Sequence, residues 1–349
     1  MAKVLDNKCP SCGAAIHFKP ELGKFKCDYC DSEFTAEQLK DMDKLKLEDD
    51  KDNYSSYMNY NCPDCGAEII TDSNTAATFC VYCGNTSIIK SRLSGEFAPS
   101  KIIPFKIEKK KAVEAFIHLR KGRPLTPKFF TSEKNIEKIQ GVYIPFWLYD
   151  INVSGTIDAK ATKVTSWRSG DTHYTKTDYY KIVRSGDMSY NHVPVDGSTR
   201  FDNDMMNSIE PFDYSKLIDY NHAYLSGFLA EKYDVSKDDA FKDAKDRTLN
   251  STRQEMLSSV VGYSSKVVTS SDLDCSIKND LYVLLPVWMV NVKYNDKYYL
   301  FAMNGESGKF IGNIPLDKKR ALIISIIIFV LAFVVCIIGS IVIFKLGVN

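Results

Sequence analysis

Residues 9–30 read CPSCGAAIHFKPELGKFKCDYC, and residues 62–83 repeat the same pattern as CPDCGAEIITDSNTAATFCVYC. Each segment has two Cys-x2-Cys pairs separated by 14 residues, and nine of the 22 aligned positions are identical. Every cysteine of the second segment lies 53 positions after its counterpart, as Cys62 does after Cys9, so the segments are an internal duplication. The cysteines of the two frames are Cys9, Cys12, Cys27, Cys30, Cys62, Cys65, Cys80 and Cys83.

The cysteine spacing predicts metal binding. Two thiolates separated by two residues can hold one ion from a tight turn, and two such turns complete a tetrahedral sulfur shell that suits Zn²⁺. Gly13 and Gly66 follow the second thiolate of the first pair, where such turns favour positive φ. Two alternatives to zinc are less favoured. Disulfides would need an oxidising compartment, and the usual four-cysteine iron–sulfur sites have other cysteine spacings. We expect two small all-β zinc ribbons, at residues 1–35 and 61–96, each with one closed, structural zinc site.

Residues 321–344, ALIISIIIFVLAFVVCIIGSIVIF, contain no charged side chain. As a helix they would be about 36 Å long, enough to cross a hydrocarbon core of about 30 Å. Lys318, Lys319 and Arg320 precede this segment and Lys345 alone follows it, so the positive-inside rule places the body in the cytoplasm. The sequence therefore predicts a single-pass, tail-anchored protein of the cell membrane, with the lipid bilayer as one partner.

Between these ends, residues 97–317 are predicted to form an α+β domain, and residues 36–60 a helical, acidic linker between the ribbons. Helices are expected over 108–121, from Ser132 to Gly141, and over 236–258, where Ser-Lys-Asp-Asp resembles a capping box. Strands are expected from 142 to about 183 and from 266 onward, with a hairpin turn at Asn304-Gly305. The predicted fold class is two small all-β zinc ribbons, an α+β domain and one C-terminal transmembrane helix.

The chain shows little catalytic apparatus. Its 45 Lys+Arg and 44 Asp+Glu give a net charge of +1, which excludes a protein that acts through a strong overall field. The Gly-Lys pairs at 23–24 and 308–309 precede Phe, whereas a phosphate-binding loop needs Ser or Thr there. The histidines match no zinc-hydrolase motif. We predict that the protein is not an enzyme, and we assign no catalytic residue and no cofactor beyond two structural zinc ions.

Residues 101–128 carry nine Lys/Arg and two Glu, a local charge of +7. This stretch could meet anionic lipid, nucleic acid or an acidic protein, or it could form the solvated face of the helix at 108–121. The ribbons themselves are not basic, since residues 9–34 hold three Lys and four acids. A ribbon that grips DNA normally needs cations to neutralise phosphates.

Several motifs together resemble a bacterial protein family. They are the paired ribbons, the segments IPFW at 144–147 and LPVW at 285–288, the stretch MNGESGKFIGNIPLDKKR before the terminal span, and the span itself. The chain resembles tail-anchored membrane proteins with duplicated zinc ribbons of the transcription-factor-IIB type, some of which are labelled primosomal-helicase-like. The helicase label is not supported, because the chain lacks the phosphate loop of that motor.

The resemblance covers nearly the whole chain. It implies the eight cysteines as zinc ligands, and partners of the phage-shock-protein-A and flotillin-like (SPFH) types in a membrane-stress response. We therefore expect an adaptor that recruits partner proteins at the cytoplasmic face of the membrane. The alternative is a membrane-tethered nucleic-acid-binding regulator that uses the ribbons and residues 101–128. The sequence leaves the oligomeric state open.

Overall fold

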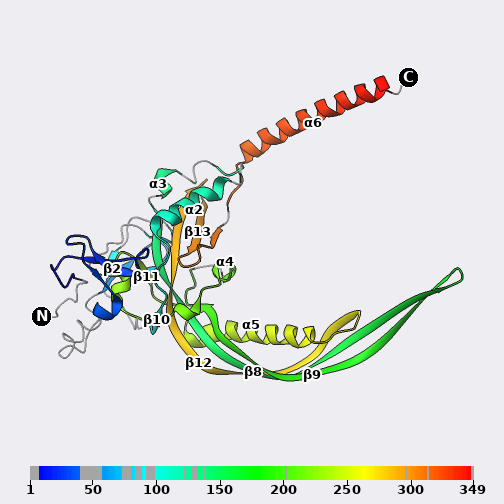
Figure 1. Cartoon of the computed structure of the whole chain (residues 1–349), viewed down its shortest axis with the longest axis horizontal. Helices are drawn as coiled ribbons and strands as arrows, with labels where there is room; N and C mark the ends of the chain where they lie inside the picture. The colour runs from blue at the N-terminus through cyan, green and yellow to red at the C-terminus, as the bar shows by residue number, and fades with distance from the viewer. Residues whose placement is uncertain are drawn as a thin grey trace.

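The computed structural model describes residues 8–346 except 40–56, 73–79, 84–88, 92–98, 128–131 and 201–202, and except positions 122, 124, 137, 296 and 313. Most of the expected linker at 36–60 lies outside these residues. The two cysteine-rich segments lie at one end of the molecule, and a long sheet and the C-terminal helix extend from the body on the other side (Figure 1).

Three long antiparallel strands dominate the fold: β8 (Gln140–Ser169), β9 (Thr172–Asp196) and β12 (Ser265–Tyr294). β8 lies in the middle, with β9 along one edge and β12 along the other. The apolar run from Val142 to Tyr149 is buried throughout, whereas from Ile151 onward buried and exposed residues largely alternate. The sheet is therefore covered on both faces in the body and on one face as far as about residue 162, while residues 163–169 are exposed on both faces.

Helix α5 (Lys237–Ser258) covers that one face of the long sheet (Figure 1). Its N-cap Ser236 accepts a hydrogen bond from the Asp239 N–H, as the capping-box pattern predicts. Its buried residues are spaced four apart and small except for the last, which lets the helix lie close to the strands. They are Ala240, Ala244, Thr248, Thr252 and Met256.

The long strands belong to a larger sheet in the order β10-β7-β12-β8-β11-β5-β4-β6, with β9 on β8, β13 on β12, and β14 on β13. A separate three-stranded sheet has the order β1-β2-β3. The short strands are β1 (Ile16–Lys19), β2 (Lys24–Cys27), β3 (Glu33–Phe34), β4 (Tyr57–Asn61), β5 (Glu68–Asp72), β6 (Ile89–Ser91), β7 (Lys101–Ile102), β10 (Ile218–Asp219), β11 (Leu229–Glu231), β13 (Lys297–Asn304) and β14 (Phe310–Gly312).

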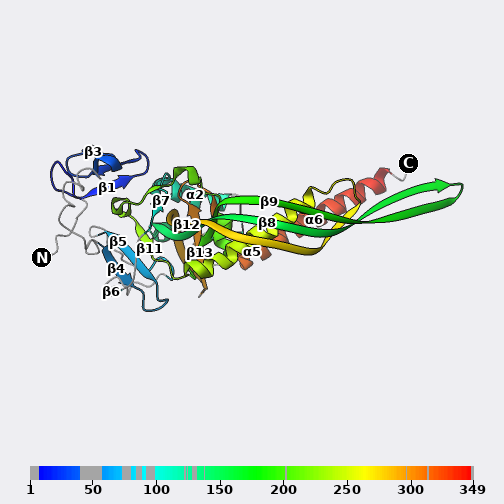
Figure 2. The ribbon, with the colours of Figure 1, turned by 90° about the horizontal axis from the view of Figure 1, so that it is seen from below.

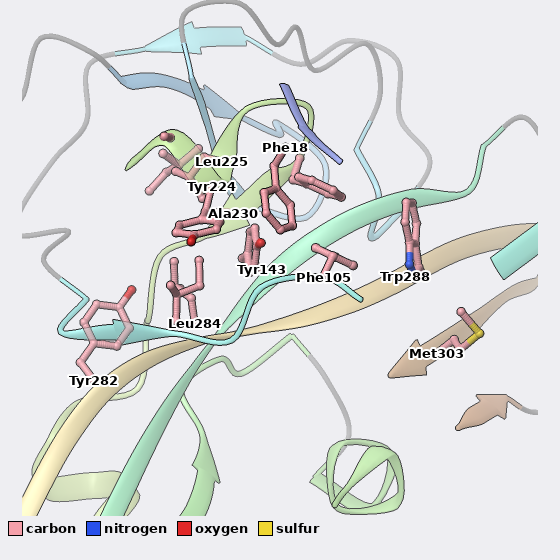
Figure 3. Close-up of a cluster of buried hydrophobic side chains, with 14 of the residues drawn as sticks. Phe18, Phe105, Tyr143, Tyr224, Leu225, Ala230, Tyr282, Leu284, Trp288 and Met303 are labelled. Atoms are coloured by element: carbon pink, nitrogen blue, oxygen red, sulfur yellow. The ribbon is translucent and has the colours of Figure 1, made fainter. Parts of the chain in front are cut away.

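Aromatic side chains fill the core on one side of the central sheet (Figure 3). Phe105 stacks on Phe228 with 4.3 Å between ring centroids, and Trp288 meets Phe105 edge-on. The tryptophans of the segments IPFW and LPVW are both buried and hydrogen-bonded: Trp147 Nε1 donates to the Val235 carbonyl, and Trp288 Nε1 to the Ile107 carbonyl. The donors of these large side chains are thus satisfied inside the core.

The helix predictions agree with the structure in two cases and fail in one. The helices expected over 108–121 and 236–258 are α2 (Lys109–Lys121) and α5. The helix expected from Ser132 to Gly141 is only the short α3 (Glu133–Ile136), because β8 already starts at Gln140. At Gly141 a Cβ would lie 2.6 Å from the Phe228 ring, so a larger residue would not fit at this position of the strand. The remaining helical segments are α4 (Asn203–Ile209), η4 (Tyr214–Lys216) and η5 (His222–Leu225).

The predicted α+β class needs correction, because the molecule is β-rich. The strand run expected to end near 183 continues as β9 to Asp196. Ser185, Asp187 and Ser189 have low strand propensity, yet each pairs with β8 through the backbone. The hairpin turn expected at Asn304-Gly305 does follow β13 and leads into β14.

The last helix, α6 (Lys318–Leu346), projects from the body (Figure 1). Among the described residues it is the one helix long and apolar enough to cross a membrane, and none of its apolar window is buried in the body. Its first turn is anchored through Asp317, whose N–H donates to the Leu125 carbonyl and whose carboxylate accepts from the Arg320 N–H. These features are consistent with membrane anchoring.

Candidate metal centres

The structure brings the eight cysteines together in two separate clusters of four. Within each cluster all four sulfur atoms lie within 4.8 Å of one another. In the first, Sγ of Cys9 lies 3.5 Å from Sγ of Cys30, and Cys12 lies 3.5 Å from Cys27. The second cluster repeats this pairing: its Sγ–Sγ distances are 3.5 and 3.6 Å, for Cys62–Cys83 and Cys65–Cys80 respectively.

These distances fit a tetrahedral metal shell better than disulfides. Four sulfurs at about 2.3 Å from a zinc ion lie about 3.8 Å apart, while a disulfide joins sulfurs at about 2.0 Å. All eight thiols are free. Each cluster could therefore hold one metal ion, and the sulfur ligand set is consistent with two zinc ions. The assignment of the eight cysteines as zinc ligands stays a prediction.

Matching tight turns position the first cysteine pair of each cluster. The Gly13 N–H donates to the Cys9 carbonyl and the Gly66 N–H to the Cys62 carbonyl, both at 2.8 Å. Gly13 and Gly66 have φ of +78° and +71°, which a side chain would strain. The duplication therefore preserves the backbone geometry as well as the cysteine spacing.

The surroundings of the thiols influence their protonation. Hydrogen bonding with Ser32 lowers the pKa of Cys30 to about 6, whereas burial raises the pKa of Cys80. A metal binds the thiolate form, so it would drive the proton off a buried thiol such as Cys80. Binding of an ion would therefore hold Cys80 in its thiolate form.

The first cluster is packed against the body through aromatic rings. Phe18 and Phe25, on β1 and β2, each lie with ring centroids 5.1 Å from that of Tyr224 on η5 (Figure 3). The buried Ser226 hydroxyl donates to the Ile16 carbonyl at 2.6 Å. His17, inside this ribbon, lies 3.1 Å from Ser226 Oγ, and it is not part of the cysteine cluster.

The second cluster is joined to the body by backbone pairing. β5 pairs with β11, and β11 pairs in parallel with β8, so this ribbon continues the central sheet. Arg200 also holds the turn of the cluster: its guanidinium donates to the Cys65 and Gly66 carbonyls at 2.8 Å each. The Arg200 Nε lies 2.9 Å from the Glu231 carboxylate, which is 1% exposed. The domain division at residues 96 and 97 stays a prediction, but this sheet crosses it.

Sequence reasoning missed the residues that dock the clusters, notably Arg200, Glu231 and Tyr224. Isolated residues of these types far from the cysteines carry no spacing signal, so only the fold reveals their role.

The duplicated ribbons differ at one equivalent tyrosine. Tyr29 and Tyr82 occupy the same position in the two frames. Tyr29 is 82% exposed, whereas the Tyr82 hydroxyl is buried and interacts with Glu231. The second ribbon therefore uses for docking a face that the first ribbon leaves free.

The protein is similar over most of its length to the uncharacterized protein YdjG from Bacillus subtilis (strain 168). The two are 36% identical over 318 residues, which cover 91% of this chain and 92% of YdjG. The chain belongs to the YdjG family. No family model and no solved structure matches the chain. The match therefore covers most of both chains.

Proposed function

We propose that this YdjG-family protein is a membrane-anchored adaptor that binds and recruits partner proteins at the cytoplasmic face of the membrane. One observation carries the proposal: two four-cysteine clusters are joined to a body whose chain ends in a membrane-length helix. Four sulfur ligands fill a tetrahedral shell and leave no position for substrate or activated water. Closed metal sites of this kind stabilise the fold of the ribbon, and the exposed side chains of the ribbon then bind the partner protein.

Zinc is the metal that best suits the two clusters. The sulfur-only ligand set, the distances and the turn geometry support it. The cations at 318–320 before α6 and the single Lys345 after it support a cytoplasmic body. By resemblance, phage-shock-protein-A-type and flotillin-like (SPFH) proteins are the partners to test first, in a membrane-stress response.

Tyr29 is the ribbon residue best placed to contact a partner. Exposed tyrosines often dominate binding energy at protein interfaces, because they bury a large area at small entropic cost. Leu22, 44% exposed, lies in the turn of the same ribbon and would add apolar area. The equivalent face of the second ribbon is occupied by the body.

Affinity purification of the full-length protein from detergent tests the adaptor function. Tyr29→Ala should lose partners recovered by the wild-type protein while keeping both metal ions, as native mass spectrometry would report. Cys62→Ser with Cys65→Ser should lose some partners while the protein stays in the membrane. Tyr179→Ala is the matched control, since Tyr179 is similarly exposed at 79% but lies on the long hairpin. An unchanged partner set after disruption of both ribbons would contradict the proposal.

The second candidate is a membrane-tethered nucleic-acid-binding regulator. Exposed cations support it: Lys106, Lys110, Lys111 and Arg123 are all solvent-accessible in the stretch 101–128. Such binding would weaken steeply with salt, because it releases counterions from phosphates. Titration of the full-length protein in detergent with DNA distinguishes the candidates. If DNA does not bind even at low salt, the regulator proposal is wrong, and the adaptor proposal is not affected.

A further inference from the structure

The β8–β9 hairpin extends past the end of the third strand. β12 begins at Ser265, which pairs with Thr162, so residues 163–169 of β8 have strand pairing with β9 alone among the described residues. At a rise of about 3.3 Å per residue, these seven residues extend the two-stranded ribbon about 23 Å beyond the end of β12 (Figure 2). Two-stranded ribbons are marginally stable in water by themselves. A surface against which the ribbon lies would therefore stabilise it.

The tip of the hairpin is a well-defined turn. Gly170 and Asp171 form a two-residue connection, and Gly170 has φ of +61°. Glycine with positive φ at the first central position is typical of a type II′ turn, whose twist matches that of the paired strands. The ribbon therefore presents its distal side chains in a fixed register.

Two aromatic side chains lie exposed next to this turn. Trp167 and Tyr174 are directly opposite in the strand register, and their rings stack with 5.5 Å between centroids. They are 48% and 45% exposed, whereas Trp147 and Trp288 are 8% and 6% exposed and bonded in the core. Trp and Tyr, with an apolar body and a polar edge, favour the interface between bilayer and water.

The distal part of the hairpin carries a small excess of positive charge. Between residues 163 and 176 there are three cations, Lys163, Arg168 and Lys176, and one acid, Asp171. Nearer the body, the exposed acids Asp187, Asp272 and Asp274 on β9 and β12 are mixed with the exposed cations Lys181 and Lys278. Two of the distal cations have acidic neighbours, Arg168 with Asp171 and Lys176 with Asp178, and these pairs are exposed. An anionic surface would attract the net positive charge that remains, at about 1 kcal/mol per cation near the surface.

The tip and the membrane helix point to the same side of the molecule. In Figures 1 and 2 the hairpin tip and the C-terminal end both lie away from the zinc-ribbon strands β1–β3. We propose that residues 163–176, the distal ribbon, form a second membrane contact that inserts Trp167 and Tyr174 into the interface of an anionic bilayer. This inference rests on the membrane anchoring in the proposed function. Because α6 already holds the chain at the bilayer, even a weak second contact would be populated.

Tryptophan quenching in vesicles tests this contact. The full-length protein is reconstituted into vesicles of phosphatidylcholine and phosphatidylglycerol in equal parts, with brominated acyl chains. The chain has three tryptophans, so the difference between wild type and Trp167→Phe isolates the Trp167 emission. We expect brominated lipid to quench this component at least twofold and acrylamide to quench it less than in detergent. Protection from acrylamide without quenching by brominated lipid would indicate a second copy or another protein, and would overturn the proposal.

Charge variants test the preference for anionic lipid. Lys163→Gln, Arg168→Gln and Lys176→Gln together should reduce lipid quenching to the level seen in vesicles of phosphatidylcholine alone. The matched control is Lys24→Gln, Lys242→Gln and Lys297→Gln, which removes three exposed cations elsewhere and should change nothing. Equal quenching in both lipid compositions would contradict the electrostatic part of the contact.

A carbonate wash separates failure of the contact from failure of the anchor. If the protein stays in the vesicles and Trp167 is not quenched, α6 anchors the chain but the distal ribbon does not touch lipid, and this proposal is wrong. If the protein washes off, the membrane anchoring itself is wrong, and the second contact falls with it.

Discussion

At the scale of single residues, Arg200 connects the second metal cluster to the body. Its guanidinium holds two carbonyls of the Cys65–Gly66 turn and pairs with the buried Glu231. We predict that Arg200→Ala lowers the free energy of unfolding by about 3 kcal/mol, because the buried Glu231 carboxylate loses its cation and keeps only its hydroxyl donors, such as Ser198. Native mass spectrometry during chelation should show the second zinc ion leaving first. Lys26→Ala, which removes an exposed ion pair with Asp31 in the first ribbon, is the control and should have little effect. Equal zinc loss from both sites in Arg200→Ala would contradict the assignment.

Asp196 should make stability depend on pH. Burial, with the nearby Glu231 charge, raises the pKa of Asp196 to about 8, and burial raises the pKa of Glu231 to about 7. A carboxyl whose pKa is raised on folding binds its proton more tightly in the folded state than in the unfolded state. The contribution of Asp196 to the free energy of unfolding is therefore fully present below about pH 4, and it is lost as the pH rises to about 8.

The variant Asp196→Asn tests this pH dependence. Its amide keeps the oxygen that accepts from the Ser198 N–H, but it does not titrate. We expect the drop in thermal unfolding midpoint between pH 5 and pH 8 to become smaller in this variant than in wild type. Asp274→Asn, at an exposed position, is the control. An unchanged pH profile in Asp196→Asn would show that Asp196 does not titrate in this range.

At the scale of elements, alanine substitutions at two paired glycines distinguish the effect of backbone strain from the effect of an added methyl group. Gly155 on β8 pairs with Gly186 on β9. At Gly155, φ is +144° and a Cβ would lie 2.1 Å from the Asp272 carbonyl oxygen, whereas a Cβ at Gly186 meets only Met256 at 3.9 Å. We predict that Gly155→Ala destabilises the long sheet by about 2–4 kcal/mol, because β12 must shift.

Limited proteolysis of the hairpin measures this difference. Gly155→Ala should speed cleavage between residues 160 and 180, since the three strands no longer pair closely. Gly186→Ala should leave cleavage near the wild-type rate, or slow it slightly by restricting the unfolded chain. Similar cleavage in the two variants would mean that the close approach of β8 and β12 is not required.

At the scale of the whole molecule, the two ribbons are coupled to the body differently. The first forms its own sheet and packs through aromatic rings, whereas the second shares backbone pairs with β11 of the central sheet. We predict that removing zinc with a chelator increases amide hydrogen exchange in β5 and β11, while α5 and the distal β8 keep their protection. Mass spectrometry of exchange in detergent checks this. An increase confined to the ribbons themselves would mean that the second ribbon folds independently of the central sheet.

The duplicated cysteine frames, the terminal helix and the helices at α2 and α5 follow from local sequence. Metal-ligand spacing, an uncharged run and a capping pattern at Ser236 are short-range signals, and the structure agrees with each. The helix expected from Ser132 to Gly141 is only the short α3, since β8 starts at Gln140 and the Phe228 ring packs directly against Gly141. Such contacts join residues far apart in sequence, and no spacing rule contains them.

The sequence alone determined that eight cysteines form two matched frames and that the chain ends in a membrane-length segment, since covalent spacing and hydropathy are local properties. Only the tertiary structure decided that the central part is β-rich, with three strands of 25 to 30 residues. It also decided that the duplicates have different roles, with Tyr29 free and the Tyr82 hydroxyl buried beside Glu231. The physical reason is that strand pairing and burial depend on partners distant in sequence, and the same ribbon can dock or remain exposed according to what lies next to it.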